Sequence, residues 1–179
     1  MKKLLFLAAF LISLQLTQAQ TDKGDWMVGG TLGFNTAKNS ANVTFDPQVG
    51  YFFLKNLVLG GQINLSYNEQ GTIHFTDIGV GPFARYYFGE SKARPFFTGD
   101  MSFINNHFKT ETTSGTSQAF GYFLGGGASF FINENVAVDG ILGYRHVKYK
   151  NEDGTGGLNF KVGFQVFLSH RQVSRITGR

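Results

Sequence analysis

Apolar and polar side chains alternate with a period of two along most of the chain from residue 25 onward, and this pattern constrains the fold most. The run 158–168 shows it best. One face of this run consists of Leu158, Phe160, Val162, Phe164, Val166 and Leu168. The opposite face carries Asn159, Lys161, Gly163 and Gln165. Because successive side chains on a β-strand point to opposite sides, the run predicts a strand whose apolar face is hidden in a core or in lipid.

Eight runs of this kind follow one another, separated by short polar segments rich in Asn, Gly, Ser, Glu and Lys. They predict strands over residues 25–37, 43–53, 57–67, 73–88, 95–108, 119–132, 136–149 and 158–168. The 24 glycines and 20 phenylalanines, with only 3 prolines, suit long continuous strands. Past residue 20 no stretch approaches the length of an apolar membrane helix. We therefore expect an all-β fold, an eight-stranded antiparallel up-and-down barrel.

The first 19 residues have the layout of a secretory signal peptide. Lys2 and Lys3 precede an apolar run from Leu4 to Leu14, and Ala19 supplies a small residue at the expected cleavage site. An uncleaved anchor is the competing interpretation, but the apolar run is short for a spanning helix. We expect three parts: a signal peptide over 1–19, a barrel over 20–168 and a short basic tail over 169–179.

Charge and cysteine content exclude several classes of function. Removal of residues 1–19 takes away Lys2 and Lys3 and no acid, so the formal charge falls from +4 to +2. Such a small excess predicts no nucleic-acid partner. The chain has no cysteine, which rules out disulfides, thiol catalysis and cysteine metal sites.

Alternation alone does not say which face of the barrel is inside. The polar faces carry mainly Gly, Ser, Thr, Asn and Gln, whereas a sheet that faces water usually shows more Lys and Glu. Small residues with sparse charges fit a narrow closed lumen. The expected lumen charges are Asp46, Arg85, Asp100, Asp139, Arg145 and Lys161. The pattern therefore predicts an inverted, transmembrane barrel, with Phe160, Val162, Phe164 and Val166 facing lipid.

Aromatic residues gather beside the three short turns LKN, GESKAR and NEN, where a membrane-interface girdle is expected. This predicted girdle consists of Trp26, Tyr51, Phe52, Phe53, Tyr86, Tyr87, Phe88, Phe96, Phe97, Phe130 and Phe131. The other four connections contain KNSAN, NEQGT, KTETTSGTSQ and KNEDGTGG. They are somewhat longer and more polar, and we expect them to be external loops.

The chain resembles the eight-stranded outer-membrane barrel family typified by OmpA and OmpX, especially the generic barrel proteins of Bacteroidetes-type bacteria. The resemblance covers residues 24–168. It rests on GDWMVGGTLGF, DPQVGYFFLKNLVLGGQINLSY, GVGPFARYYF with ARPFFTGD, GGGASFFINENVAVDGILGY and LNFKVGFQVFL. It implies residence in the outer membrane, contact with its lipid and lipopolysaccharide, and the barrel assembly machinery as a partner.

The end of the chain departs from this family, whose members usually finish on the aromatic residue of the last strand. Here Phe167 and Leu168 are followed by SHRQVSRITGR. A short polar terminus is usually poorly ordered, so we expect a disordered extension. The alternative is a basic segment that contacts a periplasmic polymer or lipid.

Eight strands enclose an interior just wide enough for side chains, which argues against an open diffusion pore. We expect the lumen charges to pair with one another and Arg145 to be the central cation of that network. The predicted function is a non-enzymatic structural or surface-interaction scaffold whose loops meet an extracellular partner. No cofactor is expected, and GGGASF and GTGG lack the Lys and Ser or Thr of a phosphate loop.

Two alternatives remain open from the sequence. His74, His107 and His146 map to the external rim, with Ser66, Ser102, Ser114 and Asp77 in the same half, so a lipid-modifying enzyme is conceivable. The same histidines could instead gather a metal. The other alternative is a soluble periplasmic barrel that binds a small apolar ligand among Phe160, Val162 and Phe164.

Overall fold

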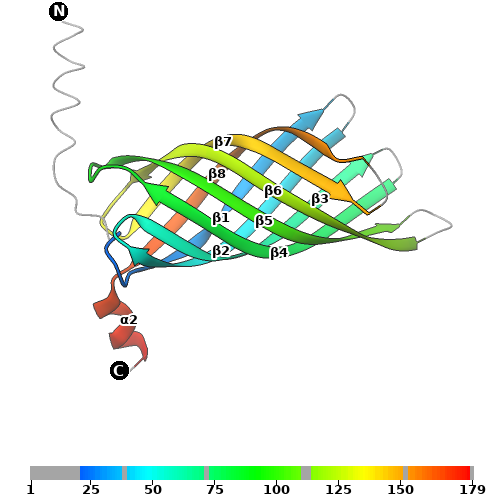
Figure 1. The fold of residues 1–179 in the computed structure, drawn as a ribbon. Helices are drawn as coiled ribbons and strands as arrows, with labels where there is room; N and C mark the ends of the chain where they lie inside the picture. Colours follow the sequence, from blue (N-terminus) through cyan, green and yellow to red (C-terminus); the bar gives the residue numbers. More distant parts are fainter. Residues whose placement is uncertain (1–20, 38–39, 71–72, 110–113, 151–152, 178–179) are drawn as a thin grey trace, which may run out of the picture.

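The protein forms a barrel of eight strands that ends in a short helix, shown as a computed structural model in Figure 1. The structure describes residues 21–37, 40–70, 73–109, 114–150 and 153–177, so the predicted signal peptide lies outside the described residues. The elements are β1 (Trp26–Ala37), β2 (Ser40–Leu54), β3 (Leu57–Gln70), β4 (Ile73–Tyr87), β5 (Ala93–Lys109), β6 (Ser114–Phe131), β7 (Val136–Tyr149), β8 (Thr155–Leu168) and α2 (His170–Thr177).

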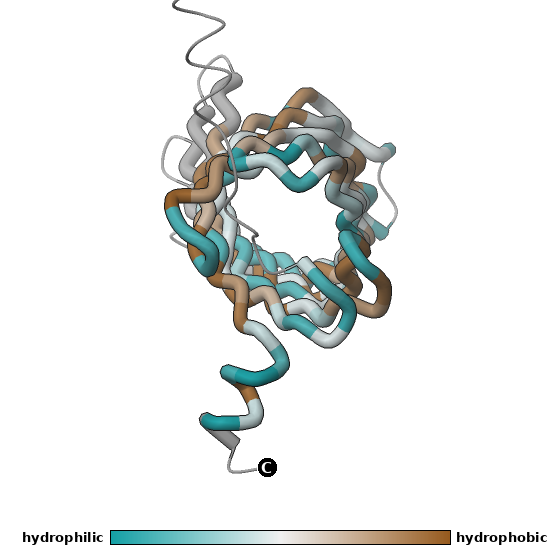
Figure 2. Tube along the Cα trace, turned by 90° about the vertical axis from the view of Figure 1, so that its left-hand side faces the viewer, coloured by the Kyte–Doolittle hydropathy of each residue, from teal (hydrophilic) through white to brown (hydrophobic). Residues whose placement is uncertain are grey.

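Each strand pairs antiparallel with its sequence neighbours, and β8 pairs with β1 to close the barrel. The closing ladder runs from Trp26 opposite Leu168 to Phe34 opposite Phe160. The β1–β2 ladder extends further, as far as Ala37 opposite Ser40. We call the end with the three short turns and α2 the turn end, and the other the loop end. Seen along its axis, the barrel is a closed ring of alternating apolar and polar positions (Figure 2).

The strands extend further toward the loop end than the sequence predicted. The hairpin of β5 and β6 pairs as far as Lys109 opposite Ser114, and β8 already begins at Thr155. Only residues 38–39, 71–72, 110–113 and 150–154 connect strands at this end. The prediction of longer external loops is therefore wrong. Residues such as Ser, Thr and Asn serve as strand residues wherever their neighbours complete the backbone ladder, even though they also favour turns.

The outer face of the barrel is apolar, as the inverted pattern predicted. Leu158, Phe97 and Leu124 have exposed fractions of 73%, 66% and 64%. Phe160 and Phe164, which the soluble alternative places around a ligand, are also about half exposed on this face. That alternative is therefore wrong, because such a continuous apolar surface requires lipid around it. No helix in the described part of the chain is long and apolar enough to cross a bilayer.

A tight turn between β2 and β3 fixes one corner of the turn end. Leu54 pairs with Leu57, so Lys55 and Asn56 alone make the connection. Asn56 has a φ of 67°, in the left-handed region that asparagine tolerates better than most residues. Its side-chain oxygen accepts a hydrogen bond from the Thr21 hydroxyl at 2.8 Å. Asn56 therefore joins the turn to the segment that precedes β1.

Substitution of Asn56 should separate the contribution of its left-handed backbone conformation from that of its side-chain hydrogen bond with Thr21. Asn56→Val and Asn56→Gly both lose the side-chain hydrogen bond from the Thr21 hydroxyl and keep the backbone bond to the Thr21 carbonyl, but only valine must force a β-branched side chain into the left-handed region. We expect the valine variant to be less stable than the glycine variant by about 1–2 kcal/mol. Urea unfolding of the two variants in lipid vesicles measures this difference. Equal stabilities would show that the turn relaxes to a different conformation.

The tail was expected to be a disordered extension, but in its described part, residues 169–177, α2 follows β8 directly. The Ser169 hydroxyl accepts the N–H of Gln172 at 3.3 Å, and the Gln172 side chain accepts the N–H of Ser169 at 2.9 Å. This reciprocal pair is a capping box. The side-chain amide of Asn135 also donates to the Gln172 side chain at 3.2 Å. These contacts provide hydrogen-bond partners for the first backbone N–H groups of the helix and fix its start to the barrel.

Candidate functional site

The described residues form two ion pairs in the barrel interior, and the first joins β8 to β2. Lys161 Nζ lies 2.8 Å from Asp46 Oδ2, and the two side chains are 4% and 1% exposed. Asp46 also accepts hydrogen bonds from the Thr31 hydroxyl at 3.3 Å and from the Asn64 amide at 2.9 Å. The Lys161 ammonium lies 4.5 Å from the centre of the Phe123 ring. This carboxylate thus connects the inner faces of four strands, β1, β2, β3 and β8.

A second buried ion pair lies nearer the turn end. Arg85 donates to Asp139 Oδ2 at 2.6 Å, and Ser129 donates to Asp139 Oδ1 at 2.5 Å. The Arg85 guanidinium also lies 4.3 Å from the centre of the Phe96 ring and donates to the Tyr87 hydroxyl at 3.2 Å. The pair therefore joins β4 to β7 across the lumen, and the remaining polar atoms of Asp139 are satisfied locally.

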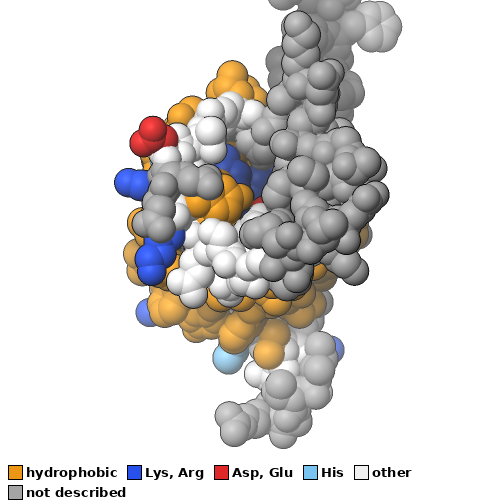
Figure 3. Space-filling view, turned by 90° about the vertical axis from the view of Figure 1, so that its right-hand side faces the viewer, with side chains coloured by type: hydrophobic (Ala, Val, Ile, Leu, Met, Phe, Trp, Pro, Cys, Tyr) orange, Lys and Arg blue, Asp and Glu red, His pale blue; other side chains and the backbone are white. Residues whose placement is uncertain are grey.

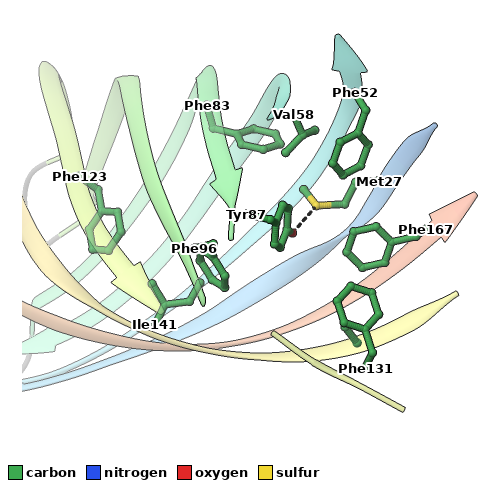
Figure 4. Close-up of a cluster of buried hydrophobic side chains, with 11 residues drawn as sticks. Met27, Phe52, Val58, Phe83, Tyr87, Phe96, Phe123, Phe131, Ile141 and Phe167 are labelled. Carbon is green, nitrogen blue, oxygen red and sulfur yellow. Dashed lines mark hydrogen bonds between the residues drawn. The ribbon is translucent and has the colours of Figure 1, made fainter. Parts of the chain in front are cut away.

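An apolar cluster fills the lumen at the turn end, and Figure 4 shows how its rings converge from around the wall. We call it the plug. It consists of Met27, Phe52, Val58, Phe83, Tyr87, Phe96, Phe123, Phe131, Ala137, Ile141 and Phe167. The Phe167 ring lies 5.0 Å from that of Phe131 and 6.1 Å from that of Tyr87. Arg94 covers the plug, 5.0 Å from the Phe131 ring, and donates to the Thr21 hydroxyl at 2.6 Å.

The plug corrects the predicted girdle. Phe52, Tyr87, Phe96 and Phe131 point into the barrel and are buried, whereas their neighbours on the same strands point outward. The outward members include Phe53, Tyr86, Phe97 and Phe130. Two aromatic residues in succession on a strand must point to opposite faces, so four of the eleven residues of the predicted girdle cannot reach the membrane.

The two glycines Gly125 and Gly143 face each other across β6 and β7, beneath the ring of Phe123. A Cβ at Gly125 would come within 2.7 Å of Phe123 Cζ. The absence of side chains here lets the Phe123 ring lie close to the wall. This packing also presents the face of the Phe123 ring to Lys161.

Beyond the ion pairs, a cavity of about 290 Å³ is present near the loop end. Figure 3 looks into the loop end and shows a hollow with basic atoms inside. The lining of the cavity includes Thr44, Asn64, Ser66, Asp77, Arg145, Tyr149 and Asn159. Asn64 Oδ1, Asn159 Oδ1 and Thr44 Oγ1 are buried and have no hydrogen-bond partner among the described residues. The cavity therefore combines the Arg145 guanidinium with polar side chains that have unpaired oxygen atoms.

The structure places the six expected lumen charges in different roles. It brings Lys161 together with Asp46 and Arg85 together with Asp139. Asp100 is buried, at 8% exposure. Arg145 lines the cavity, and within the described residues it forms no ion pair shorter than 4.0 Å. Among the described residues, Lys161 and Arg85 are the cations of the interior ion pairs, whereas Arg145, which we expected at the centre of the network, lies in the lumen at its loop end.

The strand register separates His146 from the other two histidines at the rim. The side chains of His74 and His107 lie outside the described residues, but their backbones are at the loop end of β4 and β5. On β6, His107 pairs with Thr116 and His146 pairs with Tyr122. Six residues of strand correspond to about 20 Å. The register therefore does not bring His146 to His107, and its ring instead stacks on Tyr122 at 5.3 Å.

Of the four residues expected to face lipid, Phe160, Val162 and Phe164 are 50%, 39% and 53% exposed, and Val166 is partly covered. Among the described residues no group of three or more His, Asp or Glu side chains could hold a metal ion. The contacts of Thr31, Asn64, Ser129 and Arg94 were missed by the sequence analysis. The alternation along each strand would have predicted that these four side chains point into the barrel.

Comparison with known proteins identifies the fold. A family model described as the outer membrane protein beta-barrel domain matches residues 4–166. No curated protein sequence matches the chain. The structure is similar to Neisserial surface protein A, with 16% identity, a TM-score of 0.60, and coverage of 81% of this chain and 96% of that one.

Two further solved structures have the same fold. The N-terminal β-barrel domain of Pseudomonas aeruginosa OprF has 18% identity and a TM-score of 0.52, with coverage of 80% and 98%. Ail of Yersinia pestis, in complex with the heparin analogue sucrose octasulfate, has 13% identity and a TM-score of 0.52, with coverage of 82% and 99%. The chain belongs to the outer membrane protein β-barrel family, as an eight-stranded barrel of the OmpA and OmpX type that resides in the outer membrane.

Proposed function

We propose that the protein is a non-enzymatic scaffold of the outer membrane, with a filled lumen and with its loop end outside the cell. The observation that carries this proposal is the occlusion of the lumen by two successive ion-pair layers and the plug. A transport pore needs a continuous water path, and a packed eight-stranded interior leaves little space for one. The closed wall also satisfies the backbone groups that cross the bilayer.

The proposed partners of the scaffold are the export and assembly machinery, the membrane lipids and an extracellular partner. We propose that residues 1–19 direct export, that the barrel assembly machinery inserts residues 20–168, and that lipid and lipopolysaccharide cover the apolar outer face. The loop-end hairpins and the cavity between them are the surface for an extracellular partner. Ail, a barrel of the same fold, was crystallised with a sulfated sugar analogue, which supports recognition at such a surface.

The lipid-modifying alternative is less well supported. It requires a base, a nucleophile and an orienting acid within hydrogen-bond reach of one another. His146 is held against Tyr122, several residues along the wall from His107, so the rim histidines do not supply such a group together.

Conductance measurements test the closed lumen. The purified full-length protein in a planar lipid bilayer should give no stable single-channel currents, because Lys161, Asp46 and the plug obstruct the axis. The matched variant Phe52→Ala/Tyr87→Ala/Phe167→Ala should leak more than the wild type. Heat-modifiable gel mobility first confirms that each protein is folded. Steady currents from the folded wild type would contradict the closed scaffold.

A further inference from the structure

The helix α2 leaves the barrel sideways. In Figure 1 it lies across the direction of the barrel axis, and in Figure 2, which looks along that axis, it extends outward beyond the ring of strands. Its start is fixed by the capping box and by Asp25, whose carboxylate accepts the N–H of His170 at 3.1 Å. Burial raises the pKa of Asp25, and the N–H groups of His170 and Asp22 oppose that rise. Because the strands cross the membrane along the barrel axis, a helix in this direction runs parallel to the membrane surface.

The start of α2 adjoins an aromatic row on the outer wall. The rings of Trp26 and Tyr51 lie 5.3 Å apart, and those of Tyr51 and Phe53 lie 5.1 Å apart. A Cβ at Gly24 would lie 3.8 Å from the Cβ of His170 and 4.0 Å from the Tyr51 hydroxyl, so helix and row are neighbours. Such aromatic residues sit at the level of the lipid headgroups. The helix therefore begins at the periplasmic headgroup layer.

The two sides of the helix differ in chemistry. Arg171 and Arg175 are exposed and lie four positions apart, which places them on one side. Val173 lies midway between them in sequence and therefore on the opposite side. The helix contains no acidic residue. A short basic, amphipathic helix beside an aromatic row has the features of a segment that lies in the membrane interface.

We propose that α2 is an interfacial anchor that rests on the periplasmic leaflet and binds the phosphate groups of anionic phospholipids through Arg171 and Arg175. Guanidinium groups pair well with phosphate oxygens. The apolar outer wall lies next to the start of the helix, since Leu168, which pairs with Trp26, is only two residues before His170. This inference rests on the proposed orientation of the barrel, with the loop end outside the cell, and not on any partner at the loop end.

Site-directed spin labelling of the full-length protein tests the proposal, since the chain has no cysteine of its own. A nitroxide is attached to Val173→Cys or, as the matched control on another side of the helix, to Ser174→Cys. The barrel is folded into vesicles of phosphatidylcholine, with or without phosphatidylglycerol. The label at 173 should be accessible to oxygen dissolved in the lipid. The label at 174 should be more accessible to a water-soluble nickel chelate.

Phosphatidylglycerol should increase the ratio of lipid-bound to free label at 173 by about fivefold for each arginine near the surface. Arg171→Gln/Arg175→Gln should abolish this dependence on lipid charge while the barrel keeps its heat-modifiable mobility. Equal exposure of both labels to the chelate in all vesicles would overturn the proposal. Immobilisation of the labels only when peptidoglycan fragments are added would overturn it too, in favour of a cell-wall contact.

Discussion

Replacement of Lys161 by methionine will lower the free energy of unfolding by about 3–5 kcal/mol, because it leaves the Asp46 carboxylate buried without its cation. Asp46 would keep only the neutral donors Thr31 and Asn64. Urea titration of the barrel in lipid vesicles measures the loss. The single tryptophan, Trp26, lies in β1 and supplies the fluorescence signal.

The double variant Asp46→Asn/Lys161→Met is the control for this experiment. It removes both charges, and the introduced amide oxygen still accepts the hydrogen bond from Asn64. Since replacing a whole buried pair is often close to neutral, the double variant should recover most of the stability lost in the single variant. If the single variant loses less than about 1 kcal/mol, the carboxylate is hydrated in the lumen and the pair is not the structural centre of the barrel.

Phe167→Ala should also have a large effect, about 3–5 kcal/mol, through the cavity that it leaves in the plug. Phe164→Ala is the matched comparison, because the same residue type on the same strand points outward and is 53% exposed. Lipid chains fill the space that Phe164 vacates, so only the transfer free energy of the ring is lost, about 1.5–3 kcal/mol. The same vesicle titration compares the two variants. A larger loss for Phe164 would mean that the plug is loosely packed.

The period of two predicted the strands and the direction of their faces. Lys161 and Phe160 show why: adjacent residues of such different polarity can be satisfied only if one faces a lumen and the other lipid. The same rule applied residue by residue would have separated Phe52 from Phe53 and Phe96 from Phe97, and so predicted the plug. Grouping aromatic residues by their distance from the turns obscured this alternation.

The partners across the lumen could not be predicted in the same way. Lys161 and Asp46 are 115 positions apart, on strands separated by β1. Their meeting depends on the register of two ladders, and local sequence patterns fix register only weakly. Arg145 has the same local sequence features as the paired lumen cations, yet its place on β7 puts it in the loop-end cavity, where it forms no ion pair among the described residues. The helix, in contrast, had a readable signal in Ser169 and Gln172.

The ladder between β1 and β8 ends at Phe34 and Phe160, whereas β1 and β2 remain paired to Ala37. The wall therefore has a seam between β1 and β8, and the backbone ladder of this seam stops short of the loop end. At the turn end, the N–H of His170 donates to Asp25 and so connects the residue before β1 to the start of α2, just past the last pair of the ladder, Trp26 and Leu168. We expect the pairing of β1 with β8 to open first at the loop end, where rungs are missing, and last beside the hydrogen bond between His170 and Asp25.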